Sequence, residues 1–164
     1  MKIAIFFTYD YSMETLSGSG LLERELKIYQ KINKIYGTEF IFLTYEESIE
    51  TDLSNYPEFK FIPIYKYLKK SNNKIIRFFK SFLIPFKIKS ELLEVDILHQ
   101  HQLLGVWIPF LLKIQLKIPL QVRTGYDAYL FSLKNKDNFL KSIFYKYLTK
   151  LALRSSDLYT VTSK

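Results

Sequence analysis

The sequence contains no cysteine and only five glycines and five prolines among its 164 residues. The absence of cysteine excludes disulfides and thiol-ligated metals, and it fits a reducing compartment. The scarcity of glycine and proline argues against a fold dominated by loops. The apolar run at the N-terminus ends near Phe7, too early for the apolar region of a signal peptide. No apolar run is long enough to cross a bilayer, so we expect no transmembrane helix.

Basic residues are scarce in the first part of the chain, and acidic residues are scarce in the rest. Residues 1–59 hold ten acids and five Lys or Arg, whereas residues 60–164 hold six acids and nineteen Lys or Arg. This asymmetry indicates an anionic partner for one face, such as a phosphorylated ligand or anionic lipid, unless the basic surface is merely solvated. Nucleic acid is disfavoured because no RRM, KH or helix-turn-helix signature appears.

Short apolar runs alternate with segments of helical periodicity along the whole chain. The pattern predicts strands at 2–7, 39–44, 60–65, 95–98, 120–123 and 157–162, and helices at 21–36, 74–86, 103–116 and 139–153. Residues 8–20 are expected to form a loop, and Pro85 to kink or end its helix. Alternation of this kind predicts an α/β fold, a single Rossmann-like domain over 1–164 with a doubly wound, mostly parallel sheet.

Polar residues follow two strands that a crossover helix connects. His99 and His101 end the strand at 95–98, and Thr124, Gly125, Tyr126 and Asp127 end the strand at 120–123. Parallel strands place their carboxyl ends on one edge of the sheet, where open α/β sheets bind ligands. We therefore expect a binding site at this edge.

The two histidines are the only ones in the chain, and they share a face if the strand continues. Their expected role is hydrogen bonding to a polar ligand or packing at the sheet edge. A metal site is disfavoured because no third ligand lies nearby in the sequence. Arg123 is costly to bury unless it pairs with Asp127 or meets a ligand. Asp127 could instead accept hydrogen bonds from sugar hydroxyls.

A glycine-containing turn, Ser17-Gly18-Ser19-Gly20, lies between the first strand and the first helix. Glycine permits close approach of a ligand, and the helix N-terminus offers free N–H groups to an anion. The turn is neither a dinucleotide fingerprint, since Glu23 replaces the third glycine, nor a P-loop. It is predicted either to contact the ligand or simply to start the helix.

The segment 66–90 interleaves Phe and Ile with Lys and Arg. The longer stretch from Lys60 to Lys89 holds nine basic residues and no acid. This pattern is typical of an amphipathic helix at a membrane surface, with Lys74, Arg77, Phe78 and Lys80 facing the membrane. An ordinary helix that packs its Phe residues on the sheet is the alternative.

Four sequence features, taken together, resemble the N-terminal domain of retaining, family-4-type glycosyltransferases with the GT-B fold. They are the opening strand followed by a glycine-containing loop, Val95-Asp-Ile-Leu-His-Gln-His101, the Pro-led strand Ile118 to Gly125, and the close of the domain from Leu151 to Ser163. The resemblance covers essentially the whole chain. One departure is Gly125, which stands where many members have a histidine.

The resemblance implies an acceptor-binding half of a retaining hexosyltransferase, inactive alone. It implies a UDP- or GDP-sugar as cosubstrate, no prosthetic group or metal, and a glycan or lipid-linked acceptor. The donor-binding half would be supplied in cis or in trans. The implied location is the cytoplasm, at the inner face of the membrane.

The residues expected at the acceptor site combine those of the turn and of the two strand ends. They are Gly18, Ser19, Gly20, His99, His101, Arg123, Thr124, Tyr126 and Asp127, with His101 and Asp127 as catalytic candidates. The competing hypotheses are a non-catalytic α/β ligand-binding module and a flavodoxin-like receiver. A receiver needs an acidic cluster after the first strand, and only Asp10 is near.

Overall fold

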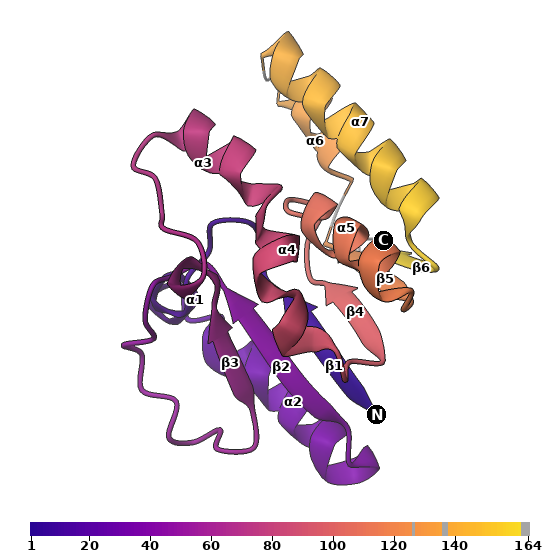
Figure 1. The fold of residues 1–164 in the computed structure, drawn as a ribbon. Coiled ribbons are helices and arrows are strands. Elements are labelled where there is room, and N and C mark those ends of the chain that lie inside the picture. The colour runs from indigo at the N-terminus through magenta and orange to yellow at the C-terminus, as the bar shows by residue number, and fades with distance from the viewer. Residues whose placement is uncertain (126, 136–137, 162–164) are drawn as a thin grey trace.

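Six parallel strands form one sheet at the centre of the molecule. The computed structural model describes residues 1–125, 127–135 and 138–161. The strands are β1 (Lys2–Phe6), β2 (Glu39–Thr44), β3 (Lys60–Pro63), β4 (Ile97–Gln100), β5 (Leu120–Thr124) and β6 (Leu158–Val161). Their order is β3-β2-β1-β4-β5-β6, so the direction of winding reverses between β1 and β4 (Figure 1). The predicted doubly wound, Rossmann-like fold is confirmed.

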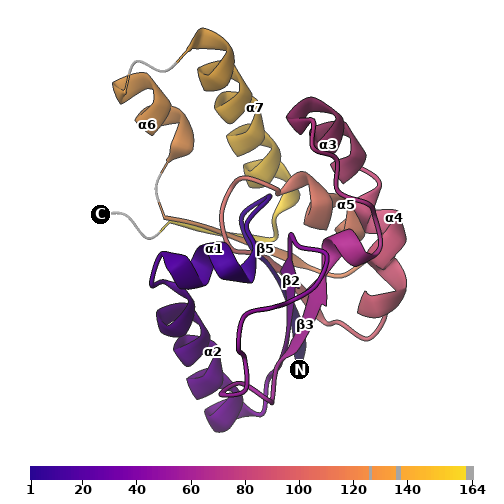
Figure 2. The same ribbon diagram turned by 90° about the vertical axis from the view of Figure 1, so that its left-hand side faces the viewer.

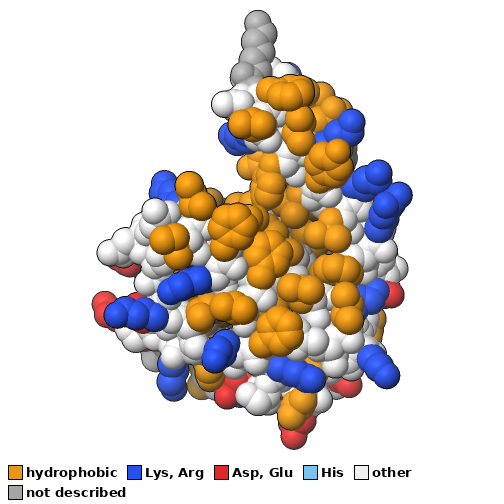
Figure 3. Space-filling model, turned by 45° about the horizontal axis from the view of Figure 1, so that its top comes forward, with side chains coloured by type: hydrophobic (Ala, Val, Ile, Leu, Met, Phe, Trp, Pro, Cys, Tyr) orange, Lys and Arg blue, Asp and Glu red, His pale blue; other side chains and the backbone are white. Residues whose placement is uncertain are grey.

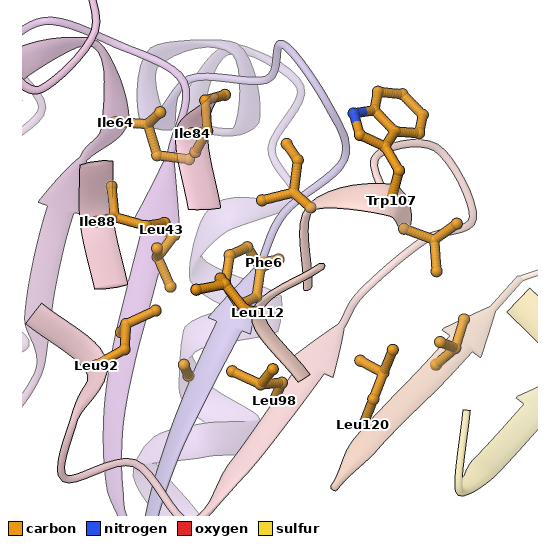
Figure 4. Close-up of a cluster of buried hydrophobic side chains, with 14 of the residues drawn as sticks. Phe6, Leu43, Ile64, Ile84, Ile88, Leu92, Leu98, Trp107, Leu112 and Leu120 are labelled. Atoms are coloured by element: carbon orange, nitrogen blue, oxygen red, sulfur yellow. The ribbon is translucent and has the colours of Figure 1, made fainter. Parts of the chain in front are cut away.

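Helices cover both faces of the sheet (Figure 2). On one face, α1 (Met13–Gly18) and α2 (Leu22–Tyr36) pack on alternate residues of β1 and β2, among them Ile5 and Phe42. The opposite face is covered by α4 (Ile84–Ile88), α5 (Trp107–Leu116) and part of α7 (Phe139–Ser155). Figure 4 shows this larger cluster, in which Phe6, Leu43 and Leu98 of the strands meet Ile84, Ile88 and Leu112 of the helices.

Two helices occur where the sequence predicted none. α1 lies inside the expected loop 8–20, where the Ser12 side chain caps it by accepting a hydrogen bond from the Thr15 N–H. α6 (Ala128–Lys134) follows β5, capped in the same way by Asp127. Helices this short carry almost no periodic signal, which explains why they were missed.

The expected helix at 74–86 is divided into two. α3 (Lys74–Ser81) ends before Phe82, and α4 begins at Ile84, with Pro85 at its start, where a missing N–H does no harm. Two short 3-10 turns, Ile64–Lys66 and Lys89–Leu92, flank this region. The division turns α4 onto the sheet, while α3 extends beyond it (Figure 1).

Two of the expected membrane-facing residues point inward instead. The Arg77 guanidinium lies 2.8 Å from an Asp10 carboxylate oxygen and donates to the Ser71 carbonyl. The Phe78 ring packs against Trp107, with 5.3 Å between ring centroids. Lys74 is exposed and Lys80 is half-buried. Within the described part of the chain, none of the helices is long and apolar enough to span a membrane.

Large apolar side chains are nevertheless exposed on α3, at its junction with α4, on α4 itself, and on α6 and α7. Figure 3 shows them gathered on one surface, with Lys and Arg side chains around them. We call this surface the apolar face. Its members are Ile75, Ile76, Phe79, Phe82, Leu83, Phe86, Leu130, Phe131, Leu133, Phe139, Leu140, Phe144 and Tyr147.

Candidate functional site

A pocket of about 370 Å³ opens beside the point where the winding of the sheet reverses. Its walls are the segments that follow β1 and β4, the first turns of α2, and parts of α6 and α7. Phe7, Thr8 and Tyr11 come from the first segment, and His101 and Gln102 from the second. Open α/β sheets bind ligands at such a switch point, so the position agrees with the predicted edge.

Close backbone packing joins the two segments that form the pocket walls. The Tyr9 N–H donates to the Leu104 carbonyl at 3.0 Å. Gly105 has a φ of 106°, and a Cβ at this position would lie 3.2 Å from the Tyr9 Cβ. A larger residue would therefore be strained and would separate the segments. Gly105 thus helps to fix the shape of the pocket.

A buried contact between a carboxylate and an imidazole forms part of the pocket wall. Glu25 on α2 places Oε2 2.9 Å from His101 Nε2, and both side chains are about nine-tenths buried. The His101 N–H donates to the Phe6 carbonyl at 2.9 Å, which extends the pairing of β1 and β4 beyond the strands. The Phe7 ring lies against the imidazole, with 5.8 Å between centroids. The pair is therefore held from the backbone, from α2 and by ring packing.

Two arginines complete the surroundings of the Glu25 carboxylate. Arg24 donates to Oε1 at 3.0 Å, and the Arg123 guanidinium lies 3.9 Å from Oε2. The hydrogen bond with His101, helped by that of Arg24 and opposed by burial, lowers the pKa of Glu25 to about 2. The carboxylate is therefore ionised at neutral pH.

His99 is as buried as His101 but is not among the residues that line the pocket. Its ring is on the same face of the sheet, 6.3 Å from the His101 ring, as strand alternation predicts. Burial lowers the pKa of His99 to about 4, so the ring is neutral at pH 7. His99 does not line the pocket, and its Nε2 has no hydrogen-bond partner among the described residues. This placement is that of a core residue next to the site.

The glycine-containing turn lies outside the pocket and leads into α2, which is the second of the two alternatives that the sequence left open. Gly18 ends α1, Ser19 caps it, and the Ser19 hydroxyl donates to the Leu16 carbonyl. Ser17 and Gly20 line a separate hollow of about 300 Å³ that also contains Glu23 and Asp52. Two carboxylates make this hollow a poor place for an anion. Only the leucines beside the turn, Leu16 and Leu21, reach the pocket.

Of the predicted site residues at the end of β5, some lie near the pocket and others do not. Arg123 faces Glu25 rather than Asp127, whose carboxylate accepts from the Leu130 N–H at the start of α6. Thr124 is buried, with its hydroxyl 3.3 Å from that of Tyr159. The Gly125 N–H donates to Gln102, a pocket residue. Tyr126 lies outside the described residues.

Sequence reasoning missed Glu25, although a signal for it exists. It lies three residues after Leu22 and four before Tyr29, on the apolar stripe of its helix. An acid at a core position is buried only with a partner, so its presence there indicates a polar site. No group of three potential His or carboxylate metal ligands occurs within residues 1–125, 127–135 and 138–161.

No family model and no curated protein sequence matches the chain. Solved structures do resemble it, among them the crystal structure of MurG from Acinetobacter baumannii, a GT-B glycosyltransferase, with a TM-score of 0.57. The chain has the fold of one half of a GT-B glycosyltransferase. The alignment covers 99% of this chain and 42% of MurG, at 12% sequence identity. The chain therefore spans less than half of the length of MurG, and this likeness shows the GT-B fold without singling out the family-4 type.

Proposed function

We propose that the chain is the acceptor-binding half of a glycosyltransferase that moves a sugar from a UDP- or GDP-sugar to a glycan or lipid-linked acceptor. The observation that carries the proposal is the position of the polar pocket. It lies at the carboxyl ends of β1 and β4, in a fold shared with one half of MurG. Carboxylate, imidazole and amide groups in its wall are suited to hydrogen bonding with sugar hydroxyls.

A second half is needed for turnover. It would bind the nucleotide sugar and neutralise the leaving diphosphate through helix N-termini and basic groups, which requires no metal. It would be supplied by the same chain or by a partner. The isolated 164-residue chain is therefore expected to bind an acceptor and to transfer no sugar.

Calorimetric titration of the isolated chain tests this proposal. Candidate glycans and soluble analogues of lipid-linked sugars are expected to bind, and UDP or GDP alone is not. Tyr11→Ala removes a ring from the pocket wall and should weaken acceptor binding about tenfold, or about 1.4 kcal/mol. Asp52→Ala, in the separate hollow, is the matched control and should leave binding unchanged. Tight binding of UDP with no acceptor binding would reverse the assignment of the two halves.

The membrane is proposed as a second partner, through the apolar face. Lys74, Lys87, Lys146 and Lys150 are exposed on the helices that carry this face. Between Lys60 and Lys89 no acid interrupts the basic residues. Apolar side chains that enter the lipid boundary, with lysines at the headgroups, are the pattern of a peripheral membrane protein. Such an anchor at the inner face of the membrane would bring the pocket close to a lipid-linked acceptor.

Vesicle cosedimentation tests the membrane partner. The chain is expected to bind phosphatidylglycerol vesicles more strongly than phosphatidylcholine vesicles, and to bind less as salt rises. Phe79→Glu should reduce binding because it places a charge within the apolar face. Ile35→Glu is the control, since Ile35 is equally exposed but lies on α2, which covers the other face of the sheet. Equal loss in both variants would contradict a localised membrane surface.

A further inference from the structure

We propose that the membrane regulates the acceptor pocket, and that a contact between Arg77 of α3 and Asp10 carries the effect. The inference rests on the proposed function, since it takes the apolar face as the membrane surface and the pocket as the acceptor site. Lipid that binds α3 holds the segment that follows β1, residues 7–11, in its pocket-forming conformation. The acceptor is therefore bound more tightly at the membrane than in solution.

α3 presents different side chains to the solvent and to the protein. Ile75, Ile76 and Phe79 are exposed and belong to the apolar face. Arg77 and Phe78 lie on the other side of the helix and contact the rest of the molecule. A helix of eight residues is only marginally stable on its own in water. Its position therefore depends on the contacts that it makes on both sides.

Arg77 connects α3 to the segment that follows β1. Its guanidinium lies 2.8 Å from one carboxylate oxygen of Asp10, and the Tyr65 hydroxyl donates to the other at 3.0 Å. The Arg77 and Asp10 side chains are 13% and 29% exposed, so water screens their attraction less than that of a surface pair. This contact therefore favours the observed position of α3 over a displaced one.

The Asp10 backbone is left-handed, with φ of 68°. A residue with a Cβ is strained in this conformation and keeps it only where its surroundings hold it. Arg77 and Tyr65 hold the Asp10 side chain from α3 and from the 3-10 turn after β3. Its neighbours in the chain are Tyr9, whose N–H donates to the segment that follows β4, and Tyr11, which lines the pocket. The position of α3 therefore affects where the Tyr11 side chain lies in the pocket wall.

Packed aromatic rings form a second connection between α3 and the same segment. The Trp107 ring packs against Phe78 of α3 and against Tyr9, with 5.3 and 5.2 Å between centroids. Its Nε1–H donates to the hydroxyl of Ser81, the last residue of α3, at 2.8 Å. Because Trp107 is the only tryptophan in the chain, its fluorescence reports the position of α3.

The apolar face is continuous only when α3 keeps its position beside α7. The Phe78 ring lies 6.2 Å from that of Phe144 on α7, so the exposed side chains of the two helices form one surface. Lipid that binds this surface therefore favours the Arg77–Asp10 contact, and with it the pocket. Coupling of this kind typically changes affinity by about 5- to 150-fold, and it acts equally in both directions.

Amide hydrogen exchange of the 164-residue chain tests the effect of lipid on the pocket. Phosphatidylglycerol vesicles, in enough excess that cosedimentation shows the chain bound, should slow exchange of the Tyr9 and Tyr11 amides about fivefold or more. Arg77→Gln should bind the vesicles through the same apolar side chains and lose this slowing. Lys74→Gln is the matched control, because it removes the same charge from an exposed position on the same helix, and it should keep the slowing.

Vesicle binding by Asp10→Asn tests the reverse direction, since Asp10 lies outside the apolar face. The variant should bind phosphatidylglycerol vesicles about fivefold or more weakly, and acrylamide should quench its Trp107 fluorescence more strongly. Removal of a negative charge alone would strengthen binding to anionic lipid, so weaker binding is attributable to the lost contact. Asp52→Asn removes the same charge in the separate hollow and should bind at least as strongly as the parent.

The outcomes separate the two proposals. Loss of the slowing in Arg77→Gln and weaker vesicle binding by Asp10→Asn support the inference. Slowing that persists in Arg77→Gln, or is absent from the parent while α3 is protected, overturns it, as does unchanged vesicle binding by Asp10→Asn. A parent chain that does not bind phosphatidylglycerol vesicles overturns the membrane partner and the inference with it. Absence of acceptor binding by calorimetry overturns the proposed acceptor site and leaves the coupling between lipid and residues 7–11 intact.

Discussion

At the scale of single residues, His99 combines deep burial with a titratable ring. Its side chain is 8% exposed, and its Nε2 has no partner among the described residues. Burial opposes a charge on this ring most strongly; a hydrogen bond with Gln121 partly offsets the lowering of the His99 pKa, and His101 and Arg123 add to it. The folded protein therefore resists protonation of His99, and the unfolded chain does not.

The free energy of unfolding should decrease as the pH falls from 6.5 to 4. The folded-state pKa of His99 is lowered from 6.5 to about 4. Between these values the unfolded state binds the proton and the folded state does not. The contribution of the neutral His99 to the free energy of unfolding is fully present above pH 6.5, and about 3 kcal/mol of this contribution is lost by pH 4. Urea unfolding at several pH values measures this slope.

Two variants isolate the contribution of His99 to this slope. His99→Gln cannot protonate and should flatten the curve between pH 6.5 and 4, whereas His101→Gln should leave the His99 contribution in place. An unchanged slope in His99→Gln would show that another group is responsible. Glu25, whose pKa is lowered to about 2, contributes a separate loss that begins only below its unfolded value of 4.5.

The sequence predicted part of the site at the residue scale. Strand alternation correctly placed His99 and His101 on one face, because that periodicity is local. The partner of Arg123 was not predictable in this way. The alternatives were Asp127, four residues along, or a ligand, whereas the structure places Glu25, 98 positions away in the sequence, beside it. Such pairs depend on how α2 crosses the sheet, which no local pattern records.

At the scale of elements, two helices end in the left-handed conformation with different residues. Gly37 caps the end of α2, with φ of 62°, and Lys117 caps the end of α5, with φ of 57°. In each case the cap N–H donates to a carbonyl four residues earlier, Asn33 and Lys113. Glycine adopts this conformation freely, whereas a residue with a Cβ is strained.

This difference predicts opposite effects of substitution at the two caps. Gly37→Ala should destabilise the protein by about 1 kcal/mol. Lys117→Gly should stabilise it by about 0.5 kcal/mol, because relief of strain is partly offset by the greater freedom of glycine in the unfolded chain. Thermal unfolding of the two variants measures both changes. The same sign of change at both positions would contradict the argument.

Helices and strands were predicted correctly where a long apolar pattern in the sequence marks them. The strand at 39–44 and the helix ending before Gly37 were predicted within a residue, because apolar runs and a glycine cap mark them. The start of α5 was placed four residues too early, since Leu103 and Leu104 continue the apolar pattern but form the pocket wall. Pattern alone does not distinguish an apolar turn at a site from the first turn of a helix.

At the scale of the whole molecule, α7 connects the pocket and the apolar face, because it contributes side chains to both. Tyr145 of this helix lines the pocket, and Leu148 and Ala152 are buried against the main core. The first turn of α7 is different, since Phe139 and Leu140 are 75% and 72% exposed. α6 and the start of α7 pack on each other and extend beyond the sheet (Figures 1 and 2).

Amide hydrogen exchange should therefore vary along the chain in a defined order. β1 and β4, enclosed at the centre of the sheet, should exchange most slowly, and the last turns of α7 more slowly than its first turn. The first turn of α7 and α6 should exchange fastest among the helices, because few buried apolar groups hold them. Phosphatidylglycerol vesicles should slow exchange in α3, α6 and the start of α7 while leaving α2 unchanged. Protection confined to α2 would contradict the apolar face as the membrane surface, because α2 covers the other face of the sheet. Equal protection by phosphatidylcholine vesicles would show that the basic residues do not contribute to membrane binding.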